Sequence, residues 1–252
     1  MKFGVCCNPD RSAEFAQAGF DFVEWAVASN LARFEELERL AANLPIAPEA
    51  WNILLPGDLK VVGPEVDNVA LRTYLERVLP RVRALGGAVV VFGSGRSRTI
   101  PEGFDRSRAE TQFEEASRII ADVAGSNDLT IVLEPLRKGE TNLINTLEEG
   151  SAVVSRIEQD SLQLLADLYH MLDNGEDLAS VASVADQLEH VHIASRPRFV
   201  PVEGDDLMDL REFLGHLKRA GYDRGLSFEC RTDDLSEFER GLRVLRREWA
   251  AA

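Results

Sequence analysis

The chain has 252 residues, with 28 Lys and Arg against 43 Asp and Glu, which gives a formal net charge of −15 at pH 7. This length suits one large domain or two small ones, because single hydrophobic cores stop growing at about 250–300 residues. The acidic balance argues against nucleic acids and anionic membranes as partners, since both require clustered Lys and Arg. No apolar stretch approaches the roughly 18 residues of a membrane span. The apolar run at the N-terminus is also too short for a signal peptide.

Short apolar runs alternate with longer amphipathic segments along the chain. The runs predict strands at residues 3–7, 20–25, 49–54, 87–92, 130–134, 163–167, 190–194 and 226–230. Helix-length patterns between them cover residues 72–85, 106–124, 143–157, 178–187, 207–219 and 236–249. Within residues 69–85, apolar side chains recur every three to four positions, as one buried helix face requires.

The repeated strand–helix unit indicates the fold. Eight units without a Pro- or Ser-rich linker predict one closed parallel sheet. The expected fold class is therefore α/β, a single (β/α)8 TIM barrel formed by one domain over residues 1–252. The main alternative is an open Rossmann-type sheet, which carries a GxGxxG motif in its first strand-to-helix turn. That turn reads Cys7-Asn8-Pro9-Asp10, so the barrel is favoured.

The fifth to eighth predicted strands each carry a side chain that can bind a metal. In a barrel of this type, functional side chains lie at the C-terminal strand ends, and successive side chains alternate between interior and helices. The inward parity at these ends belongs to Glu134, Asp167, His192 and Glu229. The outward parity, expected to pack against helices, belongs to Leu133, Val191, Ile193 and Phe228.

Three carboxylates and one imidazole need a reason to converge. Like charges at such distances repel one another unless a cation or protons compensate. A divalent metal is the simplest compensator, and three oxygen ligands with one nitrogen favour Mn2+ or Mg2+ before Zn2+. Any one of these residues alone is more typical of a loop cap, an ion pair or a core histidine. The shared register on four consecutive strands therefore carries the hypothesis.

Several motifs resemble the xylose isomerase-like superfamily of sugar isomerases and epimerases, with ketose 3-epimerases and hydroxypyruvate isomerases as its most similar branches. The motifs are Leu133-Glu134-Pro135-Leu136, Glu140-Thr141-Asn142, Asp167-Leu168-Tyr169-His170-Met171, His190-Val191-His192 with Arg198, and Ser227-Phe228-Glu229. The resemblance covers nearly the whole chain, and residues 52–59 add to it. Its specific part lies in strands five to eight.

The resemblance implies a role for each matching residue. The implied metal ligands are Glu134, Asp167, His192 and Glu229, of which Glu134 and Glu229 double as the catalytic acid/base pair. The implied substrate-binding residues are His170, Arg198 and Glu140. Homodimers or homotetramers are common for such barrels. Leu172 and the segment Pro201-Val202 depart from the family pattern in substrate-facing loops, which leaves the substrate open.

The residue types indicate a reaction. A proton on carbon next to a carbonyl becomes more acidic when a divalent metal polarises the oxygen, and a carboxylate can then remove it. The enediolate that forms regains a proton on its other face, which is epimerisation, or on the neighbouring carbon, which is isomerisation. The sequence thus predicts a metal-dependent sugar isomerase or epimerase acting on a small ketose or keto-acid.

Three alternatives remain open at this point. A metal-dependent dehydratase of keto-sugars, of the inosose type, would use the same proton abstraction but lose water. A zinc endonuclease with this barrel would need further ligands and a basic rim. A non-catalytic barrel would bind metal or sugar without turnover.

Weaker signals lie beside these motifs. One loop has the glycines of a phosphate-binding turn, Gly93-Ser94-Gly95-Arg96-Ser97-Arg98. Strand-to-helix loops also use Gly for backbone reasons, so a phosphate site is only one interpretation. Arg96 or Arg98 could contact a substrate anion. His190 is expected to support the site through hydrogen bonds. Trp25 could line the site or pack against a helix. Cys6, Cys7 and Cys230 form no disulfide framework, which indicates free thiols in a reducing cytoplasm.

Overall fold

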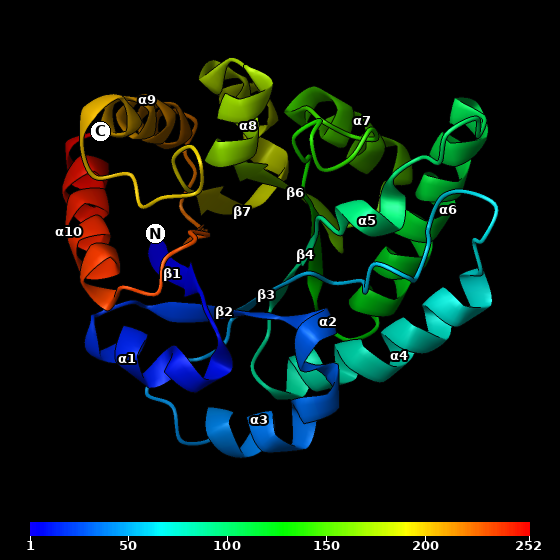
Figure 1. Ribbon diagram of the computed structural model, residues 1–252, viewed down its shortest axis with the longest axis horizontal. Coiled ribbons are helices and arrows are strands. Elements are labelled where there is room, and N and C mark those ends of the chain that lie inside the picture. The colour runs from blue at the N-terminus through cyan, green and yellow to red at the C-terminus, as the bar shows by residue number, and fades with distance from the viewer.

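The computed structural model describes residues 1–252, apart from the side chains of Leu31 and Asp205. Its strands follow one another around a closed barrel in which each pairs in parallel with the next and β8 pairs with β1 (Figure 1). The strands are β1 (Lys2–Cys6), β2 (Phe22–Ala26), β3 (Ala50–Asn52), β4 (Val89–Phe92), β5 (Thr130–Leu133), β6 (Leu162–Asp167), β7 (Leu188–Ile193) and β8 (Gly225–Phe228). The (β/α)8 fold predicted from the sequence is confirmed.

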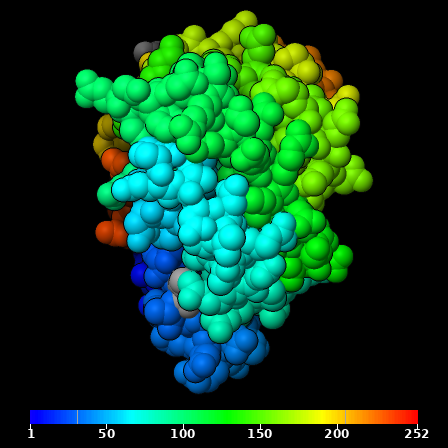
Figure 2. Space-filling view, turned by 90° about the vertical axis from the view of Figure 1, so that its right-hand side faces the viewer, coloured from blue at the N-terminus to red at the C-terminus, as the bar shows by residue number. Residues whose placement is uncertain are grey.

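Helices surround the barrel. They are η1 (Pro9–Arg11), α1 (Ser12–Gln17), α2 (Val27–Asn30), η2 (Leu31–Arg33), α3 (Phe34–Ala41), α4 (Asn68–Ala84), α5 (Gly95–Arg98), α6 (Arg106–Gly125), α7 (Leu147–Ile157), α8 (Leu168–Asn174), η3 (Leu178–Gln187), α9 (Gly204–Arg219) and α10 (Leu235–Ala251). On the face shown in Figure 2, α4 and α6 pack against each other. Among the described residues, no helix combines the length and hydrophobicity needed to cross a membrane.

The segment 178–187 differs from its prediction in helix type. It forms the 3-10 helix η3 and buries Leu178, Val181 and Val184. These apolar residues recur every third position, which matches the three residues per turn of a 3-10 helix. The segment therefore presents one continuous apolar row to the large hydrophobic core, next to α7 and α9.

Side-chain alternation along the strands separates two apolar regions. The outward residues Leu133, Val191, Ile193 and Phe228 belong to the large core beneath the helices, as predicted. Inside the barrel, Val91, Val132 and Leu165 form a small separate cluster. Gly4 leaves room for the Phe22 ring, because a Cβ at Gly4 would lie 2.3 Å from that ring. The interior is therefore filled below the strand ends, and the polar side chains lie above this filling.

Candidate metal centre and active-site pocket

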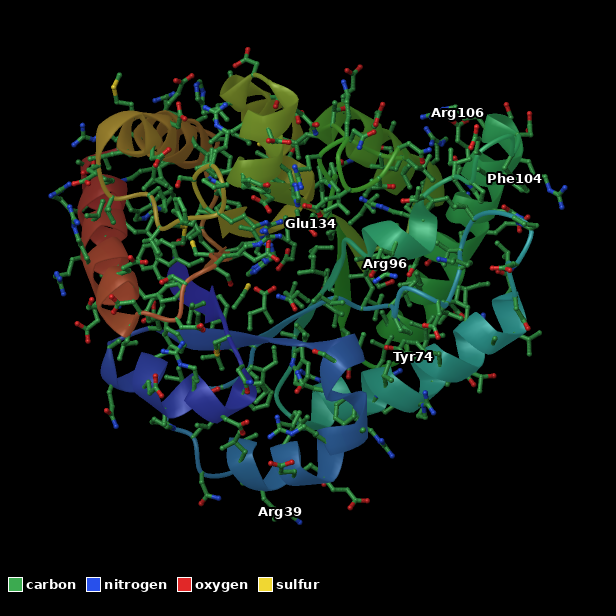
Figure 3. The ribbon with its side chains drawn as sticks, in the orientation of Figure 1. Arg39, Tyr74, Arg96, Phe104, Arg106 and Glu134 are labelled. Atoms are coloured by element: carbon green, nitrogen blue, oxygen red, sulfur yellow. The ribbon has the colours of Figure 1, made fainter. Side chains whose placement is uncertain are left out.

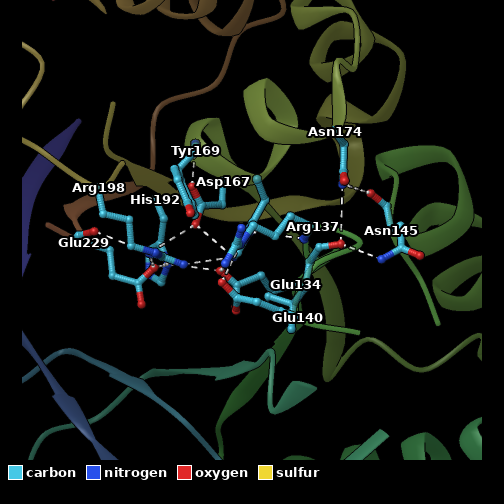
Figure 4. A network of polar contacts seen from close by, with 12 residues as sticks. Glu134, Arg137, Glu140, Asn145, Asp167, Tyr169, Asn174, His192, Arg198 and Glu229 are labelled. Atoms are coloured by element: carbon cyan, nitrogen blue, oxygen red, sulfur yellow. Dashed lines mark hydrogen bonds and ion pairs between the residues drawn. The ribbon is translucent and has the colours of Figure 1, made fainter. Parts of the chain in front are cut away.

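The four predicted ligands come together at the carboxyl ends of the strands. Glu134 and Glu229 directly follow β5 and β8, while Asp167 and His192 lie on β6 and β7. One ligand atom from each of the four lies within 4.8 Å of the others (Figure 4). His192 Nδ1 lies 3.4 Å from Glu134 Oε1 and 3.6 Å from Glu229 Oε2.

A β-bulge sets the register of two of these residues. The pairing of β6 with β7 shifts between Leu164 and Leu165, so that Asp167 pairs with His192. One extra residue on β7 brings the inward sides of both strands back into phase. Asp167 is also the N-cap of α8: its Oδ1 accepts the Tyr169 backbone N–H at 2.8 Å. This contact leaves Oδ2 to face the centre.

The donor set fits a divalent cation. Within the described part of the chain, Glu134 Oε1, Asp167 Oδ2 and His192 Nδ1 are buried and have no hydrogen-bond partner. A buried polar atom without a partner costs about 1–3 kcal/mol, and more when it is charged. Three such atoms that point at one spot are explained by a cation held between them. Three oxygens and one nitrogen suit Mn2+, Mg2+ or Zn2+.

The pKa shifts of two of the carboxyl groups also favour a bound cation. Burial raises the pKa of Glu134, and burial raises the pKa of Asp167 to about 6 although Arg198 opposes the rise. Burial also disfavours the charged form of Glu229, but the hydrogen bond and charge of His192, together with Arg198, lower the pKa of Glu229 to about 2. Burial therefore disfavours the ionised forms of Glu134 and Asp167 unless positive charge is added nearby.

Glu24 completes the centre and was missed by the sequence reasoning. This β2 carboxylate is fully buried, with Oε1 2.9 Å from His192 Nε2 and Oε2 2.9 Å from His190 Nε2. An ionised carboxylate only accepts hydrogen bonds, so both Nε2 atoms donate, and His192 Nδ1 is the ring nitrogen that faces the centre. Burial opposes the charged imidazolium, but the surrounding carboxylates raise the pKa of His192, so a cation would displace a proton from Nδ1 when it binds. The sequence signal for this role was the position of Glu24 on strand two, where side chains of its parity point into the barrel.

His190 has the supporting role expected from the sequence. Besides its contact with Glu24, its Nε2 lies 3.2 Å from the hydroxyl of Ser227. His190 is buried one layer below His192, and the two rings pack edge to face at 5.2 Å. Glu24 thus bridges the two histidines.

Two of the three predicted substrate-binding residues lie at the centre. His170 Nε2 is 3.5 Å from Asp167 Oδ2, and its Nδ1 accepts the Arg137 backbone N–H at 3.2 Å. The Arg198 guanidinium forms an ion pair with Glu229 and lies 4.4 Å from the centre of the Tyr169 ring.

Glu140 lies farther out. It lines the same cavity but accepts a hydrogen bond from Arg137 Nε at 2.9 Å. The structure therefore separates Glu140 from the cluster formed by His170 and Arg198.

A cavity of about 770 Å³ opens above the centre. Its walls include Glu134, Glu229, Gly93 and Ile53. A Cβ at Gly93 would lie 2.2 Å from Glu134 Oε2, so glycine is required there for the carboxylate to fit. The glycine at the start of the Gly93–Gly95 loop therefore makes room for Glu134.

Trp25, which the sequence places either at the site or against a helix, belongs to the large hydrophobic core. Trp25 is buried outside the barrel, packs at 5.3 Å against Trp51, and donates its Nε1–H to the Ser12 hydroxyl. It does not form a wall of the cavity. The three cysteines are free thiols, as expected, and Cys6 forms a second possible ligand group with Glu24 and His192.

These features define a (β/α)8 barrel with a carboxylate-rich candidate metal centre at the carboxyl ends of its strands. The family described as the xylose isomerase-like TIM barrel matches residues 13–248, and the chain belongs to this family.

The relatives found for this chain include sugar epimerases. The chain is 27% identical over 166 residues to a 3-dehydro-D-guloside 4-epimerase from Escherichia coli K12, which covers 62% of each protein. It thus spans less than two thirds of that relative. It is 25% identical over 248 residues to an L-ribulose 3-epimerase from Mesorhizobium japonicum, covering 94% of this chain and 81% of that protein.

Solved structures agree on the fold. A crystal structure of a D-allulose 3-epimerase from Methylomonas sp. in complex with D-allulose superposes with a TM-score of 0.87 at 20% identity. The superposition covers 98% of this chain and 97% of that one.

Proposed function

We propose that the protein is a divalent-metal-dependent sugar isomerase or epimerase that transfers a proton on a small hydroxy-carbonyl substrate through an enediolate. The observation that carries this proposal is the convergence of Glu134, Asp167, His192 and Glu229 with three buried polar atoms unpartnered among the described residues. The names of the related epimerases support the reaction class.

The four converging side chains would hold the ion, with Mn2+ the proposed metal and Mg2+ or Zn2+ the alternatives. A bound divalent ion supplies Lewis acidity, which polarises the substrate's carbonyl and makes the adjacent C–H more acidic. Glu24 keeps His192 in the tautomer that can bind the ion. Asp167 is held in place by its cap on α8.

Glu134 and Glu229 are the proposed proton-transfer pair. They extend from β5 and β8 and reach the centre from strands that β6 and β7 separate. One carboxylate removes a proton from carbon and the other returns one, which yields inversion at that carbon or transfer to its neighbour.

His170 and Arg198 are proposed to hold substrate oxygens, which fixes the reacting carbon near the carboxylates. The contacts of His170 with the Arg137 backbone and of Arg198 with the Tyr169 ring restrict both side chains. Glu140 is proposed to contact a substrate hydroxyl from the cavity wall.

The test is hydrogen exchange at carbon. Purified protein with Mn2+ is incubated in deuterated water with C3 to C6 ketoses, keto-acids and inososes, and deuterium uptake is followed by NMR and mass. Glu134→Gln and Glu229→Gln should each reduce uptake about 10²–10⁴-fold. Glu110→Gln, on the outer surface of α6, is the matched control. Uptake that persists in both active-site variants would contradict the mechanism, and a product that has lost water would identify a dehydratase.

We further propose a small-molecule partner and a reducing cytoplasm as the place of action, which agrees with the three free cysteines. The homodimer or homotetramer expected from the resemblance stays a prediction.

A further inference from the structure

The cavity above the metal centre has a positively charged wall. Its lining includes Arg96, Arg137, Arg198 and Arg231, although the chain as a whole has a net charge of −15. Most of the surface therefore repels an anion, and a local group of arginines is the exception. The contacts of each arginine decide whether its guanidinium group is free to bind a ligand.

Two of the four are neutralised by carboxylates. Arg198 forms an ion pair with Glu229. Arg137 Nε lies 2.9 Å from Glu140, and its Nη1 lies 3.4 Å from Asp173. These two guanidinium groups therefore have protein partners.

The other two have none among the described side chains. Arg96 and Arg231 are both exposed, and no described carboxylate lies within ion-pair distance of either. Arg96 follows β4 and Arg231 follows β8, so they lie on opposite sides of the barrel. Asp233 and Asp234 follow Arg231 after one intervening residue, whereas no acidic residue occurs between Phe92 and Pro101 around Arg96.

The wall that carries Arg96 is built from two loops tied together. The hydroxyl of Ser94 accepts the Leu55 backbone N–H at 3.0 Å. The hydroxyl of Ser97 donates to the Pro56 carbonyl at 2.9 Å, and the Ser97 carbonyl accepts the Val61 N–H at 3.0 Å. The loop after β4 is thereby fixed to the loop after β3.

The Arg96 side chain is itself positioned on this wall. A Cβ at Gly57 would lie 3.2 Å from Arg96 Cβ and 3.3 Å from its Nε, so the stem of the arginine runs along the glycine. Lys60 Nζ donates to the carbonyls of Arg96 and Gly57 at 3.0 and 2.7 Å. A second positive charge therefore lies behind the arginine.

Arg98, two residues further on, contacts the backbone near the metal site instead of the cavity. Arg98 is fully buried, and its Nη2 donates to the backbone carbonyl of Glu134 at 2.7 Å. It does not line the cavity, whereas Arg96 and Glu134 both do (Figure 3). Of the two arginines that the sequence left open, Arg98 supports the metal centre and Arg96 faces the ligand space.

A second observation indicates that a polar ligand fills this part of the cavity. Asn52, at the end of β3, lines the same cavity and is 8% exposed. Its Oδ1 is buried without a hydrogen-bond partner among the described residues. Buried amide oxygens are normally paired, so this one lacks a donor that a ligand hydroxyl would supply.

We propose that Arg96 binds an anionic group, a carboxylate or a phosphate, at the end of the substrate remote from the reacting carbons. A guanidinium matches either anion through two parallel hydrogen bonds. This inference rests on the proposed function and narrows its substrate class from sugars in general to sugar acids or sugar phosphates.

The test compares ketoses that differ only at one end. D-Fructose, D-fructuronate and D-fructose 6-phosphate share the keto group and carry a hydroxymethyl, a carboxylate or a phosphate at C6. Dissociation constants are measured by calorimetry with Mn2+ present, for the wild-type protein and for Arg96→Gln. Arg39→Gln removes the same charge from the outer surface at α3 and serves as the matched control (Figure 3).

We expect at least one anionic ligand to bind about tenfold tighter than fructose, which corresponds to about 1.4 kcal/mol. Arg96→Gln should reduce this ratio to within about twofold, and Arg39→Gln should leave it as in the wild type. The dissociation constants of D-fructuronate and D-fructose 6-phosphate show whether the site prefers a carboxylate or a phosphate. Equal binding of all three ligands would overturn the proposal, and so would a preference that Arg231→Gln removes and Arg96→Gln does not.

Deuterium uptake in the same samples separates this proposal from the proposed function. Uptake without an anion preference would leave the isomerase intact and refute the role of Arg96. An anion preference that depends on Arg96, with no uptake from any of the three ligands, would support the anion site and contradict the proton transfer. Binding of none of the three would overturn the anion site.

Discussion

Glu24→Gln tests how the protein prepares His192 for a metal. The carboxylate accepts hydrogen bonds from His190 and His192 at 2.9 Å each, and all three side chains are buried. Glutamine has nearly the same shape, but it offers one accepting oxygen and one donating NH2. One imidazole N–H would therefore face another N–H.

The expected cost follows from this mismatch. The variant avoids the clash when one histidine moves its proton from Nε2 to Nδ1. In His192 that proton would occupy the lone pair that faces Glu134 and Glu229, so the metal site would lose its nitrogen ligand. Loss of a hydrogen-bond partner behind a metal ligand typically costs about 10–100-fold in metal affinity. This range corresponds to about 1.4–2.8 kcal/mol.

Calorimetric titration of the metal-free protein with Mn2+ measures the effect without any substrate. Glu189→Gln is the matched control, because Glu189 lies on the same strand as His192 but pairs with Arg224 at the surface. A Glu24→Gln variant that binds Mn2+ within about twofold of wild type would refute the role assigned to Glu24.

Two further predictions concern the same centre. Asp167→Asn should stabilise the metal-free protein at pH 8 by up to about 3 kcal/mol, because burial raises the pKa of Asp167 from 3.8 to about 6 and one pKa unit corresponds to about 1.4 kcal/mol. Burial disfavours the charged form of Asp167, so the gain in stability should shrink as pH falls through 6 and vanish below 3.8. Chemical denaturation of both proteins at several pH values measures this gain. A variant that is less stable than wild type at pH 8 would contradict the prediction. Gly93→Ala should weaken Mn2+ binding at least about tenfold, because its Cβ would lie 2.2 Å from Glu134 Oε2. Gly215→Ala, which meets only the flexible end of Arg219 in α9, is its control, and equal Mn2+ affinities of the two variants would argue against the steric reasoning.

The candidate metal ligands at the strand ends were predictable because side-chain alternation is a local property of each strand. Strand alternation and barrel order place Glu134, Asp167, His192 and Glu229 on one rim without knowledge of any long-range contact. The same alternation, applied to strand two, turns Glu24 inward and Trp25 outward.

The contacts of Glu24 were not predictable in the same way. Its partner His192 is 168 residues away, and β2 and β7 are not neighbours in the sheet. Only the closed barrel brings the two side chains together across its interior. The bulge that aligns β6 with β7 likewise has no signature in either strand alone.

The central claim is that the last four strands hold one divalent ion among Glu134, Asp167, His192 and Glu229. Anomalous diffraction from a crystal grown with Mn2+ tests it most directly. We predict a single strong peak per chain, surrounded by those four side chains at bonding distance. A peak bounded instead by Cys6, Glu24 and His192, or a manganese ion bound only elsewhere on the protein, would contradict it.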